Sequence, residues 1–351
     1  MGIPTLVWMG LVLLLIAYVG FGNLKRSDED SFFNKEESNA LRGFWCLVIV
    51  LVHVPSAYQN PLQNVVGSFA YVGVTFFFMT SAYGLQLSLR KHGIKALNGF
   101  WARRLPKLLI PCLLVNALGL FERFLAGDSV SWLRLIRIDN WVIWLMFCYF
   151  AFWGVNRFLK TSCMASDVSV SLIVVALSLS SYFIGDASPI YHWPTEIWGF
   201  IWGIALARHR DTFNRIVLDK SLDSFLSAFV VSVVLGILYV KFKTVVFVGD
   251  YVIKITLGLA LIILMLVIDV IYTVSGRFNS YLGAISYEVY LAHGIIISLT
   301  ITMAAGLPSG TFIVASLVAT IVVASAIHWF GQLLLGLTAK SFVAISKTSP
   351  R

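Results

Sequence analysis

Residues 41–55 read Leu-Arg-Gly-Phe-Trp-Cys-Leu-Val-Ile-Val-Leu-Val-His-Val-Pro, an apolar run with an arginine near one end and a histidine near the other. This pattern predicts a membrane helix, in which an ionisable side chain is costly and usually functional. Arg42 and His53 are eleven residues apart, so on an α-helix they share one face, about 16 Å apart along the axis. The stretch therefore predicts a basic anchor and a candidate catalytic base on one helix.

The composition extends this interpretation to the whole chain, because 59% of the 351 residues are hydrophobic and only 12% are charged. Apolar runs of this length predict an all-α, polytopic transmembrane helix bundle rather than a soluble protein. Lipid offers the backbone no hydrogen-bond partner, so each span must be a helix. Eleven helices are expected, near residues 3–22, 41–59, 65–89, 104–124, 139–156, 168–185, 194–207, 222–240, 250–273, 281–301 and 310–337.

The chain is expected to divide into four parts, with no soluble domain on either side of the membrane. The first helix has no basic segment before it and no evident cleavage site, which favours a retained anchor over a removed signal peptide. The expected parts are an anchor (1–23), a charged cytoplasmic linker (24–40), a main membrane domain (41–337) and a cytoplasmic tail (338–351).

The distribution of lysine and arginine predicts the orientation, because cytoplasmic loops collect these residues. A cytoplasmic C-terminus leaves six of the 26 basic residues on the other side, namely Arg123, Arg134, Arg137, Lys241, Lys243 and Lys254. Topology and attraction to anionic lipid explain most of the net charge of +9, so no nucleic-acid partner is expected. A multi-pass protein of a bacterial inner membrane is the expected location.

A basic cluster lies at the expected cytoplasmic start of the fourth helix, in Phe-Trp-Ala-Arg-Arg-Leu-Pro-Lys (residues 100–107). Arg103 and Arg104 could bind phosphate groups through two hydrogen bonds each, and Lys107 would add a point charge. Arg90, Lys91, His92 and Lys95 precede the cluster. The alternative is a membrane-flanking loop that follows the usual charge bias. Arg42 is expected on the same membrane face and favours the phosphate site.

A second intramembrane candidate, His293, follows Ser286, Tyr287 and Tyr290 at offsets that place them on adjoining helix faces. This stripe could position a substrate or line a tunnel, or it could only join helices through hydrogen bonds. Glu288 in the same segment needs a partner if it is buried, and Arg277 or a lysine at the cytoplasmic side is the expected one.

On the outer side, carboxylates and aromatic rings occur together, as in many sugar-binding sites. The candidates are Asp186, Trp193, Glu196 and Trp198 in one loop, and Asp139, Asn140 and Trp141 at the start of the fifth helix. The alternative is an aromatic belt at the membrane interface. Cys46, Cys112, Cys148 and Cys163 have no paired spacing, so neither a metal site nor a disulfide is expected.

Six segments in one order resemble the membrane acyltransferase 3 family. They are the Leu-Arg-Gly to histidine helix (40–53), Gly-Val-Thr-Phe-Phe-Phe-Met-Thr-Ser-Ala-Tyr (73–83), the Arg-Arg-Leu-Pro-Lys segment (103–107), the Trp141 to Tyr149 helix, Phe-Ile-Trp-Gly (200–203) and Gly-Ala-Ile-Ser-Tyr-Glu-Val-Tyr-Leu-Ala-His (283–293). Lys107 stands where the family has a second arginine if the motif starts at Arg104, and Ala82 replaces the usual glycine after Ser81.

The resemblance implies an integral-membrane O-acyltransferase with a ten-helix core. Such an enzyme takes an acyl group, most often acetyl, from cytoplasmic acyl-coenzyme A and delivers it to a hydroxyl of a cell-surface or lipid-linked carbohydrate. It implies His53 as the essential histidine and the Arg103, Arg104 and Lys107 cluster as the essential basic motif. No permanently bound cofactor is expected. A transporter or glycan exporter of similar helix content is the alternative, although no inverted repeat is evident.

Overall fold

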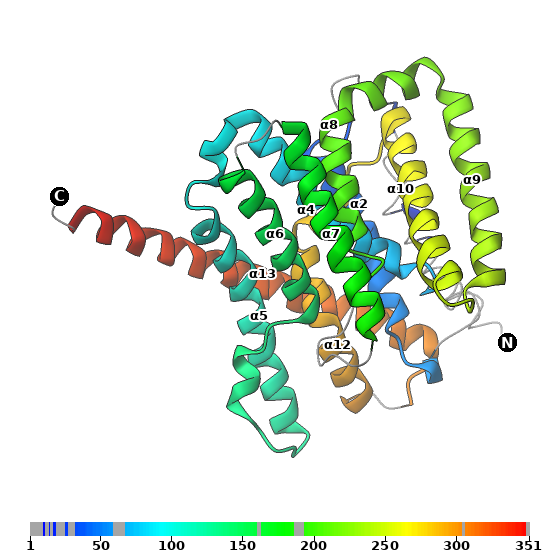
Figure 1. The fold of residues 1–351 in the computed structure, drawn as a ribbon. Helices are drawn as coiled ribbons and strands as arrows, with labels where there is room; N and C mark the ends of the chain where they lie inside the picture. Colours follow the sequence, from blue (N-terminus) through cyan, green and yellow to red (C-terminus); the bar gives the residue numbers. More distant parts are fainter. Residues whose placement is uncertain are drawn as a thin grey trace.

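The computed structural model describes residues 32–58, 67–159, 163–185, 193–303 and 306–348, with Gly10, Leu14, Ala17, Tyr18 and the pair Lys25–Arg26; side chains are described to Leu337. Figure 1 shows a bundle of helices from which the end of α13 extends toward the C-terminus. The long helices are α2 (Lys35–Val52), α4 (Ala70–His92), α5 (Phe100–Leu125), α6 (Asn140–Phe158), α7 (Cys163–Ile184), α8 (Trp198–Asp219), α9 (Ser221–Phe242), α10 (Lys254–Ile271), α12 (Ser286–Met303) and α13 (Ser309–Thr348).

Shorter elements connect these helices. They are the 3₁₀ segments η1 (Ser56–Tyr58), η2 (Gly93–Leu97) and η3 (Trp132–Ile136), the π-helical turn η5 (Val248–Ile253), the helix α11 (Arg277–Ala284) and the strands β1 (Lys25–Arg26) and β2 (Tyr272–Thr273). The two strands pair antiparallel, with Lys25 opposite Thr273. The all-α prediction is confirmed, and ten of the eleven expected helices have counterparts. The expected anchor at 3–22 lies outside the described residues, apart from four scattered positions.

Seven described helical segments are long and apolar enough to cross a membrane, and the bent pair of α11 and α12 would make an eighth. The chain is therefore a multi-pass membrane protein. The helices α2 and α8 do not pass this test because each carries several charges, Lys35, Glu36, Glu37 and Arg42 in α2 and Arg208, Arg210, Asp211 and Arg215 in α8. Most residues of α9 are exposed, as expected of a helix that faces lipid.

Helix α2 begins earlier and ends earlier than the sequence predicted. Asn34 caps its start, because the Asn34 side chain accepts hydrogen bonds from the backbone N–H groups of Glu36 (2.8 Å) and Glu37 (3.0 Å). The last helical residue is Val52, so the expected helix to residue 59 is wrong at this end. His53 is the C-cap residue, and Pro55, which cannot continue the backbone hydrogen bonds, lies beyond the helix.

The segment expected as one helix over residues 281–301 is broken. Helices α11 and α12 meet at Ile285 and differ in direction by 72°. The Ser286 hydroxyl donates to the carbonyl of Gly283 at 2.8 Å, which satisfies one of the backbone groups freed by the break. The bend brings α11 across α2, where Gly43 and Gly283 allow close approach. A Cβ atom on Gly283 would lie 1.8 Å from the carbonyl oxygen of Asn39.

Two buried carboxylates attach the start of α2 and the residues just before it to the end of α10 and the residues just after it. Asp269 accepts a hydrogen bond from the N–H of Phe33 at 3.0 Å, and Glu37 accepts one from the N–H of Val274 at 3.0 Å. Arg210 donates to the carbonyl of Phe32 from α8. These contacts fix the entry to α2 and thereby the helix that carries Arg42 and His53.

The packing of α8 against α4 depends on Gly203, because a Cβ atom there would lie 2.1 Å from the carbonyl oxygen of Met79. We expect Gly203→Ala to destabilise the protein by about 1–3 kcal/mol, since the backbones must move apart. The measurement is the thermal unfolding midpoint of the purified protein in detergent. Gly236→Ala on α9 is the matched control, because its Cβ atom meets nothing within 4 Å. Equal midpoints for the two variants would contradict the packing argument.

Candidate active site

Two histidines from different helices meet at one end of α2. The ring of His53, at the C-cap of α2, lies 4.6 Å from the ring of His293 on α12, centroid to centroid, with an interplanar angle of 64°. His293 is buried, whereas His53 is exposed in the described chain. The sequence predicted both residues as candidates, and the structure brings them together although 240 residues separate them.

Backbone contacts orient both rings. The Nδ1 atom of His53 lies 2.8 Å from the carbonyl oxygen of Ile49, and that of His293 lies 2.5 Å from the carbonyl oxygen of Tyr290. A carbonyl only accepts hydrogen bonds, so Nδ1 carries the proton in each neutral ring. The Nε2 atom of each ring then keeps its lone pair. This geometry leaves two imidazole nitrogens able to accept a proton.

Aromatic side chains continue from the histidine pair into the bundle. The Tyr290 ring lies 5.8 Å from that of His293 and 5.2 Å from that of Trp141 on α6. Trp141 is followed by Phe77 on α4, at 6.3 Å. The Tyr287 hydroxyl donates to the carbonyl of Leu108 at 2.7 Å, which attaches α12 to α5. We call Phe77, Trp141, Tyr287 and Tyr290 the aromatic wall.

Arg42 lies against this wall. Its guanidinium carbon is 5.6 Å from the centre of the Phe77 ring, within the range of a cation–π interaction. Its Nε atom is shielded and has no hydrogen-bond partner in the described chain. Tyr149 on α6 lies close enough to interact electrostatically with Arg42, and the Tyr149 ring lies 5.6 Å from the guanidinium of Arg104. Arg42 is thereby connected to the basic cluster through a single tyrosine.

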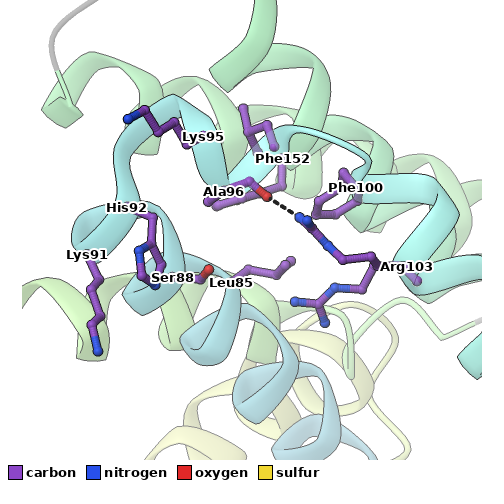
Figure 2. A pocket seen from close by; sticks show the side chains of 11 residues that line it. Leu85, Ser88, Lys91, His92, Lys95, Ala96, Phe100, Arg103 and Phe152 are labelled. Carbon is purple, nitrogen blue, oxygen red and sulfur yellow. Dashed lines mark hydrogen bonds between the residues drawn. The ribbon is translucent and has the colours of Figure 1, made fainter. Parts of the chain in front are cut away.

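The basic cluster lines a cavity of about 640 Å³. Figure 2 shows Lys91, His92 and Lys95 on one side of this cavity and Arg103 on the other. Arg103 is held in place, because it donates to the carbonyl of Ala96 at 2.8 Å. Phe100 and Phe152 supply apolar wall. The full lining is Leu85, Ser88, Lys91, His92, Lys95, Ala96, Leu97, Phe100, Arg103, Arg104 and Phe152. We call this cavity the basic pocket; it combines four permanent cations with no lining carboxylate.

One face of α4 leads from the basic pocket to the aromatic wall. Leu85 and Ser88 line the pocket, and Ser81 and Phe77 follow at helical spacing on the same face. From Ser88 to Phe77 the axial distance is about 16 Å. Ser81, in the segment 73–83 that resembles the family, is half-buried between the two ends. The pocket, Arg42, the wall and the histidine pair therefore form one continuous series of neighbours.

Several candidates lie elsewhere. Lys107 is exposed and is not part of the pocket lining. Glu196 is buried and accepts a hydrogen bond from the Lys254 amine at 2.8 Å, and the Trp198 ring nitrogen donates to the hydroxyls of Ser178 (2.9 Å) and Tyr251 (3.2 Å). Both side chains are thus engaged in joining helices. The Ser286 hydroxyl binds its own backbone turn. Asp186 lies outside the described residues.

The sequence did not predict two sets of contacts at the site. Glu288 is paired with His328 on α13, whose Nδ1 atom lies 2.9 Å from its Oε1 atom, and not with Arg277 or a lysine as expected. Forty residues separate the two, and nothing in the local sequence around His328 marks it. Tyr149 and Phe77 lie in two of the segments that resemble the family, but their contacts with Arg42 and Arg104 could not be read from those segments.

In the parts of the chain that the structure describes, no group of three or more histidine, cysteine, aspartate or glutamate side chains could hold a metal ion. Three of the four cysteines are buried as free thiols, and the Cys112 sulfur lies 3.3 Å from the Tyr287 hydroxyl. The site residues described above carry imidazole, guanidinium and ammonium groups.

A family model described as an acyltransferase domain, Acyl_transf_3, matches residues 35–329. This range starts at the first residue of α2 and ends on α13, so it includes the histidine pair, the aromatic wall and the basic pocket. No curated protein and no solved structure matches the chain.

Proposed function

The chain belongs to the acyltransferase 3 family and is a multi-pass membrane acyltransferase, and on this premise we propose its reaction. It transfers an acyl group, most often acetyl, from acyl-coenzyme A to a hydroxyl of a cell-surface or lipid-linked carbohydrate. The observation that carries the proposal is the series of contacts from the basic pocket to the two histidines. The reaction requires a site that binds the anionic coenzyme A and a group that accepts the proton of the hydroxyl. The basic pocket is suited to the first requirement and the histidine pair to the second.

The basic pocket suits the phosphates of coenzyme A. Lys91, Lys95, Arg103 and Arg104 supply four positive charges at a cavity that is large enough for part of a nucleotide. Arginine can bind a phosphate group through two parallel hydrogen bonds. Arg103 and Arg104 both lie on α5, so the helix fixes the positions from which their side chains reach the pocket. Phe100 and Phe152 offer apolar surface for the adenine ring. The flexible arm of the coenzyme would follow the α4 face past Ser81 toward Phe77.

At the far end, His53 would act on the acceptor. Its Nε2 atom takes the proton of the carbohydrate hydroxyl while the hydroxyl oxygen attacks the thioester carbonyl carbon. The tetrahedral intermediate collapses, the C–S bond breaks, and the thiolate of coenzyme A receives the proton from the imidazolium. The bond between Nδ1 and Ile49 holds the ring during both transfers. Attack by His53 itself, giving an acyl-histidine, is a second route through the same nitrogen.

Binding of coenzyme A in the basic pocket would also define the orientation of the protein in the membrane. Acyl-coenzyme A is made in the cytoplasm, so the end of the bundle with the basic pocket would face the cytoplasm, as the lysine and arginine distribution predicts. The histidine pair is then near the opposite side, where a cell-surface carbohydrate would approach. A bacterial inner membrane with the C-terminus in the cytoplasm fits this arrangement.

We expect His53→Ala to reduce acyl transfer about 10²–10⁴-fold, because the reaction loses its proton acceptor. The measurement is release of the coenzyme A thiol from acetyl-coenzyme A by the purified protein in vesicles, with crude cell-envelope glycan present. His209→Ala is the matched control, since His209 is exposed on α8 and touches none of the site residues described above. Glycan-dependent release that survives in His53→Ala would refute the role of His53. No release by the wild type from acetyl-, succinyl- or longer acyl-coenzyme A would favour a transporter.

Arg104→Gln should weaken binding of coenzyme A about tenfold or more, because one charge-assisted contact to phosphate is lost. Lys107→Gln should change the affinity less than twofold, since Lys107 lies outside the pocket lining. Both affinities are measured by equilibrium binding of labelled coenzyme A to the protein in detergent. An equal loss in the two variants would indicate general charge attraction and not a defined pocket.

A further inference from the structure

Four aromatic side chains gather where α7 ends and η5 begins. Tyr182 and Phe183 belong to the last turn of α7, Phe247 directly precedes η5, and Tyr251 lies in η5. The Phe247 ring is nearly parallel to the rings of Phe183 (6.0 Å, 18°) and Tyr251 (5.3 Å, 13°). Phe183 is 71% exposed and Phe247 is 38% exposed, whereas Tyr251 is buried. We call Tyr182, Phe183, Phe247 and Tyr251 the aromatic platform.

A carboxylate and an unusual backbone conformation fix the platform. Phe247 has a φ of 66°, which is rare for a bulky residue and persists only where surrounding contacts hold it. Its N–H group lies 2.7 Å from both the Tyr182 hydroxyl and the Asp250 Oδ1 atom. The Tyr182 hydroxyl donates to the same carboxylate at 3.0 Å. The chain then enters the π-helical turn η5, a conformation that is frequent at functional sites.

The platform combines the two kinds of surface that bind sugars. The C–H groups on one face of a sugar ring pack against the electron-rich face of an aromatic ring, which Phe183 and Phe247 present at the surface. Asp250 is only half-buried, and a carboxylate can accept about four hydrogen bonds, so it has capacity for sugar hydroxyls in addition to its contacts with Tyr182 and Phe247.

The surroundings of Asp250 favour a hydrated ligand over a lipid chain. A charged side chain is costly in hydrocarbon. Lys241 and Lys243, at the end of α9 that leads into this segment, are both exposed. Three charged side chains within ten residues therefore indicate that this end of the bundle faces water, where a carbohydrate can approach.

The platform lies at the same end of α4 as the path to the histidine pair. Three residues after Tyr251, the carbonyl of Lys254 accepts a hydrogen bond from the Tyr71 hydroxyl, at the start of α4, at 3.1 Å. Phe77 of the aromatic wall follows Tyr71 by six residues, about 9 Å along the axis, whereas the basic pocket lies at the other end of α4. The path from the platform to His293 runs through α4 and the wall, so a glycan that reaches both must hold several sugar units.

We propose that the aromatic platform binds a sugar unit of the carbohydrate acceptor at a distance from the hydroxyl that is acylated. This inference rests on the proposed function, because it assigns a site to the acceptor of that reaction. Phe183 and Phe247 pack against the sugar ring, and Asp250 accepts hydrogen bonds from its hydroxyls. Trp198 is a support of this site and not part of its surface, because its ring nitrogen donates to the Tyr251 hydroxyl at 3.2 Å.

The test compares the KM for the acceptor in variants of the platform. Phe183→Ala removes the most exposed ring, and Asp250→Asn removes the charge but keeps an acceptor for the N–H group of Phe247. In each variant we expect the KM for crude cell-envelope glycan, measured by coenzyme A thiol release, to rise about fivefold, with kcat and the KM for acetyl-coenzyme A changed less than twofold. Phe183→Trp keeps an aromatic face and should retain the wild-type KM. Phe229→Ala is the matched control, because Phe229 is 47% exposed on α9 and forms a near-parallel pair with Phe225 (6.1 Å, 17°).

Binding of labelled glycan to the protein in detergent, without acetyl-coenzyme A, gives a second readout and should weaken by the same factor. Unchanged binding and KM in both platform variants would overturn the inference, as would an equal loss in Phe229→Ala, which would show that exposed rings only anchor the protein in lipid. A lowered kcat alone would show that the platform acts on another step. If Asp250→Asn fails to fold by gel filtration, Phe183→Ala still tests the site, because Phe183 is largely exposed. A wild type that binds glycan through Phe183 but releases no thiol would refute the proposed function and leave the platform as a glycan site.

Discussion

The close approach of α2 to α11 and the start of α12 is the contact on which the arrangement of the site depends. Gly43 and Gly283 leave no room for a side chain between the two backbones, and the carbonyl of Asn39 fills the space where a Cβ atom would lie. This contact fixes α12 relative to α2, so His293 meets His53 at one end of α2, while Arg42 lies nearer the other end of the same helix. A single crossing therefore sets both the proton-accepting pair and the surroundings of the buried cation.

The charged and ionisable residues of the site lie in two places, which differ in the free energy needed to keep a charge there. The basic pocket lies at a helix end, where Lys91, Lys95 and Arg103 remain exposed and their charges are hydrated. Arg42, Glu288 and His293 lie within the bundle, where each ionisable group must be paired, supported by a ring or kept neutral. The Phe77 ring supports Arg42, His328 is paired with Glu288, and the carbonyl of Tyr290 accepts a hydrogen bond from the ring of His293.

Much of the fold could be predicted because hydrophobic runs in a membrane protein are long and unambiguous. The all-α class and most helix positions followed from these runs, and the family followed from motifs such as Leu41 to His53. The ends of helices were harder to predict from the sequence. Helix α2 ends at Val52 because His53 is its C-cap and Pro55 follows, and the pattern of apolar residues alone does not show this. Gly283, Ser286 and Glu288 interrupt the apolar run around Ile285, but an interruption does not reveal that the helix bends there by 72°.

The site was predicted in parts and not as an arrangement. Single residues with unusual chemistry for a membrane, His53, His293, Arg42 and Arg104, could be found by eye. Their neighbours could not, because Tyr149, Phe77 and His328 are ordinary residues of apolar helices whose importance arises from contacts across the bundle. Glu196 and Trp198 were chosen because carboxylates and aromatic rings occur together there. In the structure, Glu196 accepts a hydrogen bond from Lys254, and Trp198 donates to Ser178 and Tyr251.

The bend between α11 and α12 has a consequence for solvation. A helix that breaks inside a membrane frees carbonyl and N–H groups at both new ends, and Ser286 satisfies only one of the carbonyls. Hydrocarbon cannot satisfy the others, so such a break is tolerated only where protein or water surrounds it. The elbow at Ile285 must therefore be kept from lipid, and burial of Leu282, Ile285 and Ser286 inside the protein does so, which ties the bend of the helix that carries the second histidine to the packing around it.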